Sequence, residues 1–337
     1  MIYSSQSLFY QSNEKPKIFS EHTSLFLEAL EMLQKSNSEI NELMLSYHRV
    51  AALREGYLCE SFNLGEIIEN IIKWFCDIIN EIFGKFKALM FKIFSNDKSF
   101  KKYEDKFKSF NGGKMEVDFQ RYYYTCSDPE IPKCGLADQF SGELEDLRKR
   151  LKKISKCDTK AERIRVMGDI LSDLKSDTNA GYFAMVRSSC LGLTYPISQD
   201  TFPEELFNIF RNGGEYYSDR VDNREVMEAY NRFMNHKDLV KAAEAQKKQI
   251  VTSANQVKHD IKQLTLKSIS DTYVPYDIGE EQAFDDIIKR KVGQVSEVCN
   301  IYVLAFTAKL DALKESYAQD RKFLLAVISY MEEHPDD

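Results

Sequence analysis

Few residues in this sequence are spaced for a known kind of chemistry. The five histidines stand far apart, at positions 22, 48, 236, 259 and 334, and none belongs to an HxH or HExxH pattern. We therefore predict no metal site. The seven cysteines are odd in number and form no CxxC pair, which is typical of reduced thiols and not of a secreted disulfide framework.

Motifs for catalysis are also missing from the sequence. It has no phosphate-binding loop, no GxGxxG fingerprint and no GxSxG elbow, and its adjacent acidic residues, such as Asp285 and Asp286, are common on helix surfaces. The residues indicate no catalytic group, no cofactor and no small-molecule substrate. We predict a non-enzymatic protein, and an enzyme of unknown type stays open as a less favoured alternative.

The composition predicts which elements must position any functional residue. With only 14 glycines and 7 prolines in 337 residues, and 43% hydrophobic residues, the chain has few breaks and enough apolar surface for a core. This favours long helices. The net charge of −7 makes general nucleic-acid binding an unfavoured function, because phosphates must be neutralised by basic residues.

The most distinctive segment is an amphipathic helix predicted over residues 62–94. Its apolar residues recur every three or four positions, as on one helix face, and polar residues occupy the rest. We take one stripe of this face as a candidate membrane or partner surface, formed by Ile68, Ile71, Phe75, Ile78, Ile82, Phe86, Leu89 and Ile93.

A lysine cluster overlaps the end of this helix and continues beyond it. Residues 85–114 hold nine lysines and three acidic residues, whereas the whole chain is acidic. We predict a Lys-rich helix here and a basic patch formed by Lys85, Lys92, Lys98, Lys101, Lys102, Lys106 and Lys108.

Three interpretations of these two segments stay open. The apolar face can be core, covered by neighbouring helices. It can instead lie in a membrane interface, with the lysines on anionic headgroups. Nucleic acid is an unfavoured partner except through Lys85–Lys114, where aromatic residues alternate with lysines and could stack on bases.

The remaining pattern predicts a mainly α fold, a multi-helix bundle with one small β element. Helices are expected at 22–35 and 38–57, an alternating strand near 114–125, and helices at 137–155, 159–175 and 179–191. Two long helices from residue 221 onward are expected to form a helical hairpin, with coiled-coil packing as an alternative. The loop at 126–136 divides the chain into an N-terminal region, 1–126, and a C-terminal helical domain, 137–337.

Residues 60–125 resemble a family of phage proteins. The order of a wide Ile/Trp/Phe helix (EIIENIIKWFCDIINEIFGKFKALMFKIF), a Lys-rich segment (KSFKKYEDKFKSF) and a tyrosine strand (VDFQRYYYT) is similar to virion structural proteins of large tailed bacteriophages, including internal and ejected ones. The resemblance implies a structural protein located in the virion, with other virion subunits or further copies of the chain as partners. We expect synthesis in the host cytoplasm from the lack of a signal-peptide pattern. We expect contact with an anionic membrane surface from the amphipathic helix and the lysine cluster.

The alternative function is a phage or host-interaction protein that binds a protein partner through the same helix. The N-terminus has neither the basic stretch nor the apolar core of a signal peptide, and no run of apolar residues is long enough for a spanning helix.

Overall fold

The computed structural model of the chain describes most of the predicted helical segments. It describes residues 25, 28–29, 31–36, 38, 64–94, 97–115, 117–120, 136–177, 180–190, 193–202, 205–206, 215–218, 220–264 and 278–334. The helices predicted at 22–35 and 38–57 therefore lie partly or almost wholly outside the described residues. So do the loop at 126–136, apart from residue 136, and the end of the predicted strand.

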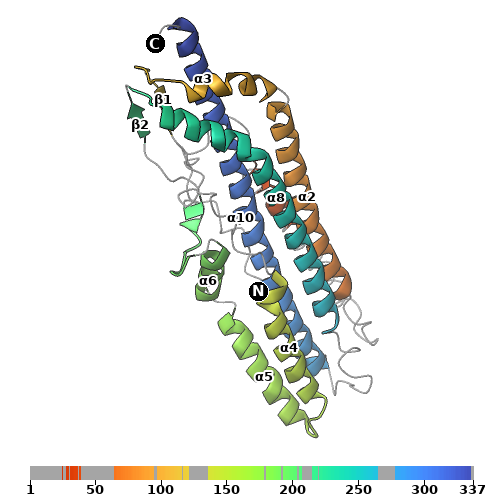
Figure 1. The fold of residues 1–337 in the computed structure, drawn as a ribbon. Coiled ribbons are helices and arrows are strands. Elements are labelled where there is room, and N and C mark those ends of the chain that lie inside the picture. The colour runs from red at the N-terminus through yellow and green to blue at the C-terminus, as the bar shows by residue number, and fades with distance from the viewer. Residues whose placement is uncertain are drawn as a thin grey trace.

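The prediction of a mainly α fold is confirmed (Figure 1). The α-helices are α2 (Leu64–Phe94), α3 (Glu104–Lys108), α4 (Leu136–Ile154), α5 (Lys160–Asp177), α6 (Ala180–Cys190), α8 (Asn223–Lys262) and α10 (Ile278–Glu333), and a 3-10 helix, η2 (Asp97–Tyr103), precedes α3. The Lys-rich segment is thus a 3-10 helix followed by a short α-helix and not one continuous α-helix.

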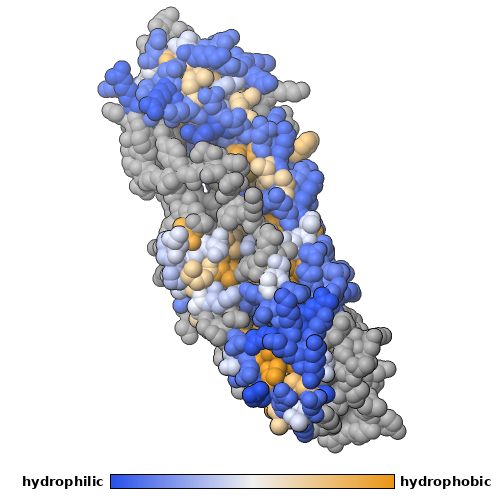
Figure 2. Space-filling view, turned by 60° about the horizontal axis from the view of Figure 1, so that its bottom comes forward, coloured by the Kyte–Doolittle hydropathy of each residue, from blue (hydrophilic) through white to orange (hydrophobic). Residues whose placement is uncertain are grey.

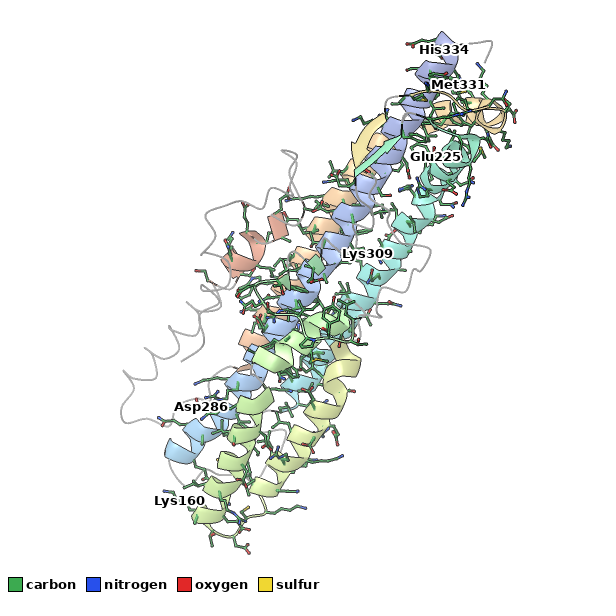
Figure 3. The ribbon with its side chains drawn as sticks, turned by 90° about the vertical axis from the view of Figure 1, so that its left-hand side faces the viewer. Lys160, Glu225, Asp286, Lys309, Met331 and His334 are labelled. Atoms are coloured by element: carbon green, nitrogen blue, oxygen red, sulfur yellow. The ribbon has the colours of Figure 1, made fainter. Side chains whose placement is uncertain are left out.

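The molecule is a rod built along α10, with α2 and α8 beside it (Figure 1). With 56 residues, α10 is about 84 Å long. Helix α8 runs antiparallel to it, since Arg232 pairs with Asp320 at 2.9 Å and Gln246 accepts a hydrogen bond from Lys309 at 2.8 Å. Figure 3 shows His334 at one end of the rod and Lys160 at the other.

The long helices follow from local sequence signals. Helix α8 contains neither glycine nor proline, and it begins with a capping box. The Glu225 backbone N–H donates to the Asp222 carboxylate at 2.9 Å, and the Asp222 N–H donates to the Glu225 carboxylate at 3.2 Å. Each bond satisfies a donor that the first helical turn leaves open, so the start of α8 is well specified.

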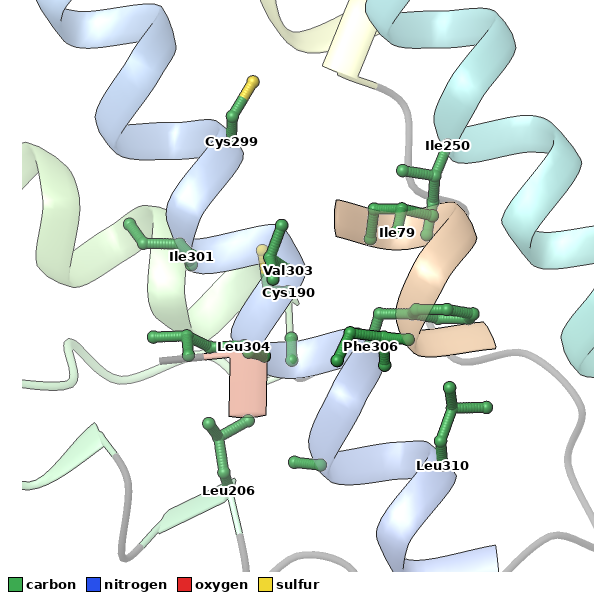
Figure 4. Close-up of a cluster of buried hydrophobic side chains, with 14 of the residues drawn as sticks. Ile79, Cys190, Leu206, Ile250, Cys299, Ile301, Val303, Leu304, Phe306 and Leu310 are labelled. Atoms are coloured by element: carbon green, nitrogen blue, oxygen red, sulfur yellow. The ribbon is translucent and has the colours of Figure 1, made fainter. Parts of the chain in front are cut away.

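One hydrophobic core joins the two predicted regions of the chain. Figure 4 shows Ile79 of α2, Ile250 of α8 and Phe306 of α10 pointing toward one another. The rings of Phe83 and Phe306 lie 6.4 Å apart, and buried side chains from α2 through α10 form a single cluster. The region 1–126 therefore contributes α2 to the same core that the region 137–337 builds.

Polar groups inside the rod are paired across helices. Lys291 on α10 is buried, and its ammonium donates to Glu143 on α4 at 2.5 Å and lies over the Phe140 ring. Leu25, in an N-terminal helical segment, donates its backbone N–H to Asp311 on α10 at 3.2 Å. A buried charge without its partner is costly, so these pairs favour one register of the helices over others.

Two short strands meet at the end of the rod near the C-terminus of α10. Strand β1 (Val117–Gln120) pairs antiparallel with β2 (Glu215–Ser218), with Val117 opposite Ser218. An isolated bridge between Gly113 and Val221 adjoins this ladder. Together with η2 and α3, these segments form the end that we call the apex (Figure 1).

The surface of the rod is mainly polar. In Figure 2, which brings the end with α4 and α5 forward, the coloured residues are mostly hydrophilic and the hydrophobic ones form small, separate patches. Within the described residues, no helix is both long and apolar enough to span a membrane.

Candidate functional site

The apolar stripe of α2 lies inside the rod. Five of its eight residues are buried against the other helices: Ile71, Phe75, Ile78, Ile82 and Phe86. Leu89 is 36% exposed, and the side chains of Ile68 and Ile93 lie outside the described residues. In this conformation the stripe serves as core, which is the first of the three interpretations that the sequence left open.

The predicted basic patch separates into two groups. Lys85 on α2 forms ion pairs with Glu28 at 2.6 Å and Glu81 at 3.1 Å, and these bonds raise its pKa. At the apex, Lys108 pairs with Glu104 at 2.7 Å. These paired lysines offer little uncompensated charge to a ligand.

Three exposed lysines stand together on η2 and α3. Lys101, Lys102 and Lys106, which we call the apex lysines, have no ion-pair partner among the described residues, and Lys106 lies over the Tyr103 ring at 5.6 Å. The side chains of Lys92 and Lys98 lie outside the described residues. Among the lysines of the predicted patch whose side chains are described, the uncompensated ones are therefore at the apex.

The aromatic residues between the lysines hold η2 and α3 on the rod. Phe100 packs on Phe233 with ring centroids 4.8 Å apart, and Phe107 packs on Tyr230 at 5.5 Å. Both phenylalanines are fully buried. They are therefore not available to stack on bases, which removes the main support for a single-stranded nucleic-acid site here.

Hydrogen bonds complete the attachment of the apex to α8 and α10. The Asn223 side-chain amide donates to the carbonyl oxygens of Phe107 and Lys108, at 2.7 and 3.1 Å. The Tyr230 hydroxyl donates to Glu104 at 3.0 Å, and that carboxyl has a lowered pKa because Lys108 and Tyr230 both donate to it. The short helix is thereby fixed with its lysines facing outward.

An open cleft of about 860 Å³ lies at the same end of the rod. Its lining includes Gly113, Lys114, Arg220, Tyr330 and His334, which come from three segments far apart in the sequence. Our prediction of the site missed this cleft. The Asn-Gly-Gly turn at 111–113 marks one of its walls, but nothing local to residues 220 or 330–334 indicates that they meet it.

The ionisable groups with strongly shifted pKa values lie elsewhere. Burial raises the pKa of the Cys76 thiol to about 11 and that of Cys190 to about 12, so neither is a reactive thiolate. Burial also raises the pKa of Glu297. None of these groups lines the cleft, and in the described residues no three ligand-type side chains gather as a metal site would need.

Comparisons with known proteins find no relative of this chain. No family model matches it, and neither a curated protein nor a solved structure does.

Proposed function

We propose that this chain is a non-enzymatic structural or internal protein of a phage virion that contacts an anionic membrane surface through the apex lysines. The single observation that carries the contact is that Lys101, Lys102 and Lys106 are exposed and lack an ion-pair partner among the described residues. Each lysine near an anionic bilayer contributes about 1 kcal/mol, so three of them favour binding measurably.

The fold and the location of the protein have their own places in the proposed function. The hairpin of α8 and α10 is its rigid shaft, and the small β element near residues 114–125 is part of its apex. The resemblance of residues 60–125 alone supports location in the virion, with virion or self subunits as partners. Synthesis in the host cytoplasm belongs to the same proposal. Mass spectrometry of purified particles tests that part directly.

The apolar stripe of α2 has a secondary role in the proposal. Because Phe75, Ile82 and Phe86 are buried, contact of this stripe with lipid requires α2 to leave α8 and α10. Electrostatic binding of the apex therefore comes first, and any insertion of α2 follows it.

Co-flotation with vesicles tests the membrane contact. We expect the protein to float with phosphatidylserine-containing vesicles at low salt. In about 1 M salt, where charges are screened within roughly 3 Å, it should not bind these vesicles. It should not bind purely zwitterionic vesicles at either salt concentration. Replacing Lys101, Lys102 and Lys106 by Gln should weaken binding by about 3 kcal/mol, or roughly a hundredfold.

A matched triple variant controls for total charge. Lys152, Lys153 and Lys156 are exposed and lie at the opposite end of the rod, so their replacement by Gln removes the same charge away from the apex. Vesicle binding should survive this change. An equal loss of vesicle binding in both triple variants would contradict the proposal, and so would vesicle binding that does not change with salt concentration.

A protein partner is the second candidate function, and one observation favours it. Phe91 on α2 is 74% exposed beside the partly exposed Leu89. If Phe91→Ser abolishes capture of a virion subunit while vesicle binding is unchanged, this second function is the one supported.

A further inference from the structure

We propose that the cleft at the apex binds a nucleoside phosphate, with Lys114 and Arg220 on its phosphate and the Tyr330–His334 ring pair beside its base. This goes beyond the membrane contact, because it concerns a small molecule and residues other than the apex lysines.

Backbone pairing brings the two cationic residues together. The Gly113 N–H donates to the Val221 carbonyl at 3.0 Å, and the Val221 N–H donates to the Gly113 carbonyl at 2.9 Å. Lys114 follows Gly113 and Arg220 precedes Val221 in the sequence, so this bridge brings both cationic residues to the same part of the apex. Both line the cleft.

The charges in the cleft favour an anion. Lys114 and Arg220 both line the cleft, so an anion bound there would meet two cationic side chains. Glu333 also lines the cleft and offsets part of the charge. Arginine and lysine together are the usual protein ligands of phosphate, with arginine able to donate two hydrogen bonds at once.

Two aromatic rings at the end of α10 also line the cleft. The rings of Tyr330 and His334 are stacked, with centroids 4.3 Å apart and planes 19° from parallel. The His334 imidazole is positioned by a hydrogen-bond contact of its Nδ1 with the Tyr330 carbonyl oxygen, at 3.1 Å. A Cβ at position 113 would come within 2.4 Å of the Tyr330 ring, so the ring lies directly against Gly113.

Size and chemistry together indicate the ligand class. A cleft of about 860 Å³ is far larger than inorganic phosphate needs and lies within the range of about 300–1,000 Å³ that is typical of small-molecule sites. A flat aromatic wall next to two cationic residues suits a ligand with both a base and a phosphate.

Isothermal titration calorimetry with four probes tests this proposal. We expect adenosine 5′-monophosphate to bind more tightly than inorganic phosphate, adenosine or glycerol 3-phosphate, since only the first carries both groups. Glycerol 3-phosphate stands for a lipid headgroup, and equal affinity for it would overturn the assignment to a nucleotide. Absence of saturable binding of the monophosphate at millimolar concentration would overturn the site itself.

Matched variants locate the binding. Lys114→Gln should lower the affinity for the monophosphate by about tenfold or more, because a charge-assisted hydrogen bond is lost. Lys102→Gln on η2 should change this affinity by less than about twofold. His334→Ala should lower affinity for the monophosphate and leave that for inorganic phosphate unchanged. Equal effects of Lys114→Gln and Lys102→Gln would place the anion outside the cleft.

The outcomes are separable from those for membrane binding. Lys114→Gln should leave vesicle flotation largely intact, and the triple change of the apex lysines should leave the calorimetry largely intact. Each proposal can therefore fail while the other stands.

Discussion

At the scale of single residues, His236 is the clearest case of a group whose chemistry is set by its surroundings. It is buried on α8, its Nδ1 lies 2.5 Å from the Arg232 carbonyl, and its ring meets the Tyr317 ring edge-on at 4.8 Å. Its Nε2 is buried without a hydrogen-bond partner among the described residues. Burial lowers the pKa of His236 to about 4, so the folded protein keeps it neutral.

This predicts a loss of stability in mild acid. The folded pKa is below the unfolded value of about 6.5, so the unfolded chain binds the extra proton and stability falls as the pH drops from about 6.5 toward 4. Between pH 7.5 and 5, His236 should account for about 2 kcal/mol of the decrease in the free energy of unfolding. Urea unfolding of wild type and His236→Gln at both pH values measures this difference.

Besides burial, the charge of Arg232 contributes to the lowered pKa of His236, and Arg232 itself pairs with Asp320 on α10. His259, exposed on the same helix, is the matched control. His259→Gln removes a histidine without opening the core. If His236→Gln and His259→Gln show the same pH dependence, the burial of His236 does not govern acid stability.

At the scale of elements, the two sides of α2 differ in what they contribute. Phe86 is fully buried, whereas Leu89, three residues later on the same helix, is 36% exposed. Phe86→Ala should cost about 3–5 kcal/mol through lost burial and the cavity left behind, and Leu89→Ala should cost under about 1 kcal/mol. Equal, small effects in chemical denaturation would mean that α2 is not packed on the rod in solution.

The same element shows what periodicity can and cannot predict. The helix at 62–94 was evident from its apolar spacing, and the helices at 137–155, 159–175 and 179–191 correspond to α4, α5 and α6. The apolar stripe on α2 was also predicted from the sequence. The sequence did not predict what the stripe packs against, because the residues that cover it lie on α8 and α10, more than a hundred positions away.

At the scale of the whole molecule, elongation is the main prediction. A compact domain of 337 residues has a radius of gyration of about 20 Å. A rod that contains the 56-residue α10, about 84 Å long, must exceed this value clearly. Small-angle X-ray scattering of the monomer should give a larger radius and a longest dimension above about 80 Å. A radius near 20 Å would contradict the rod.

Charge at this scale also depends on folding. The excess of lysine in residues 85–114 could be counted directly from the sequence. Folding divides that excess, since Lys85 meets Glu28 and Lys87 lies 3.6 Å from Glu244, whereas the apex lysines stay exposed. A sum of charges over a segment therefore overstates what a surface presents.

The sequence by itself determined the helical class of this protein, the position of its main helices and the amphipathic character of α2, because these depend on the local spacing of side chains and on the scarcity of glycine and proline. The tertiary structure alone decided that the apolar stripe is core, that Lys85 is paired whereas, among the described residues, the apex lysines are not, and that Lys114 and Arg220 line one cleft. The physical reason is that a local pattern specifies which face of an element is apolar or charged, whereas contacts between residues far apart in the sequence decide what that face meets.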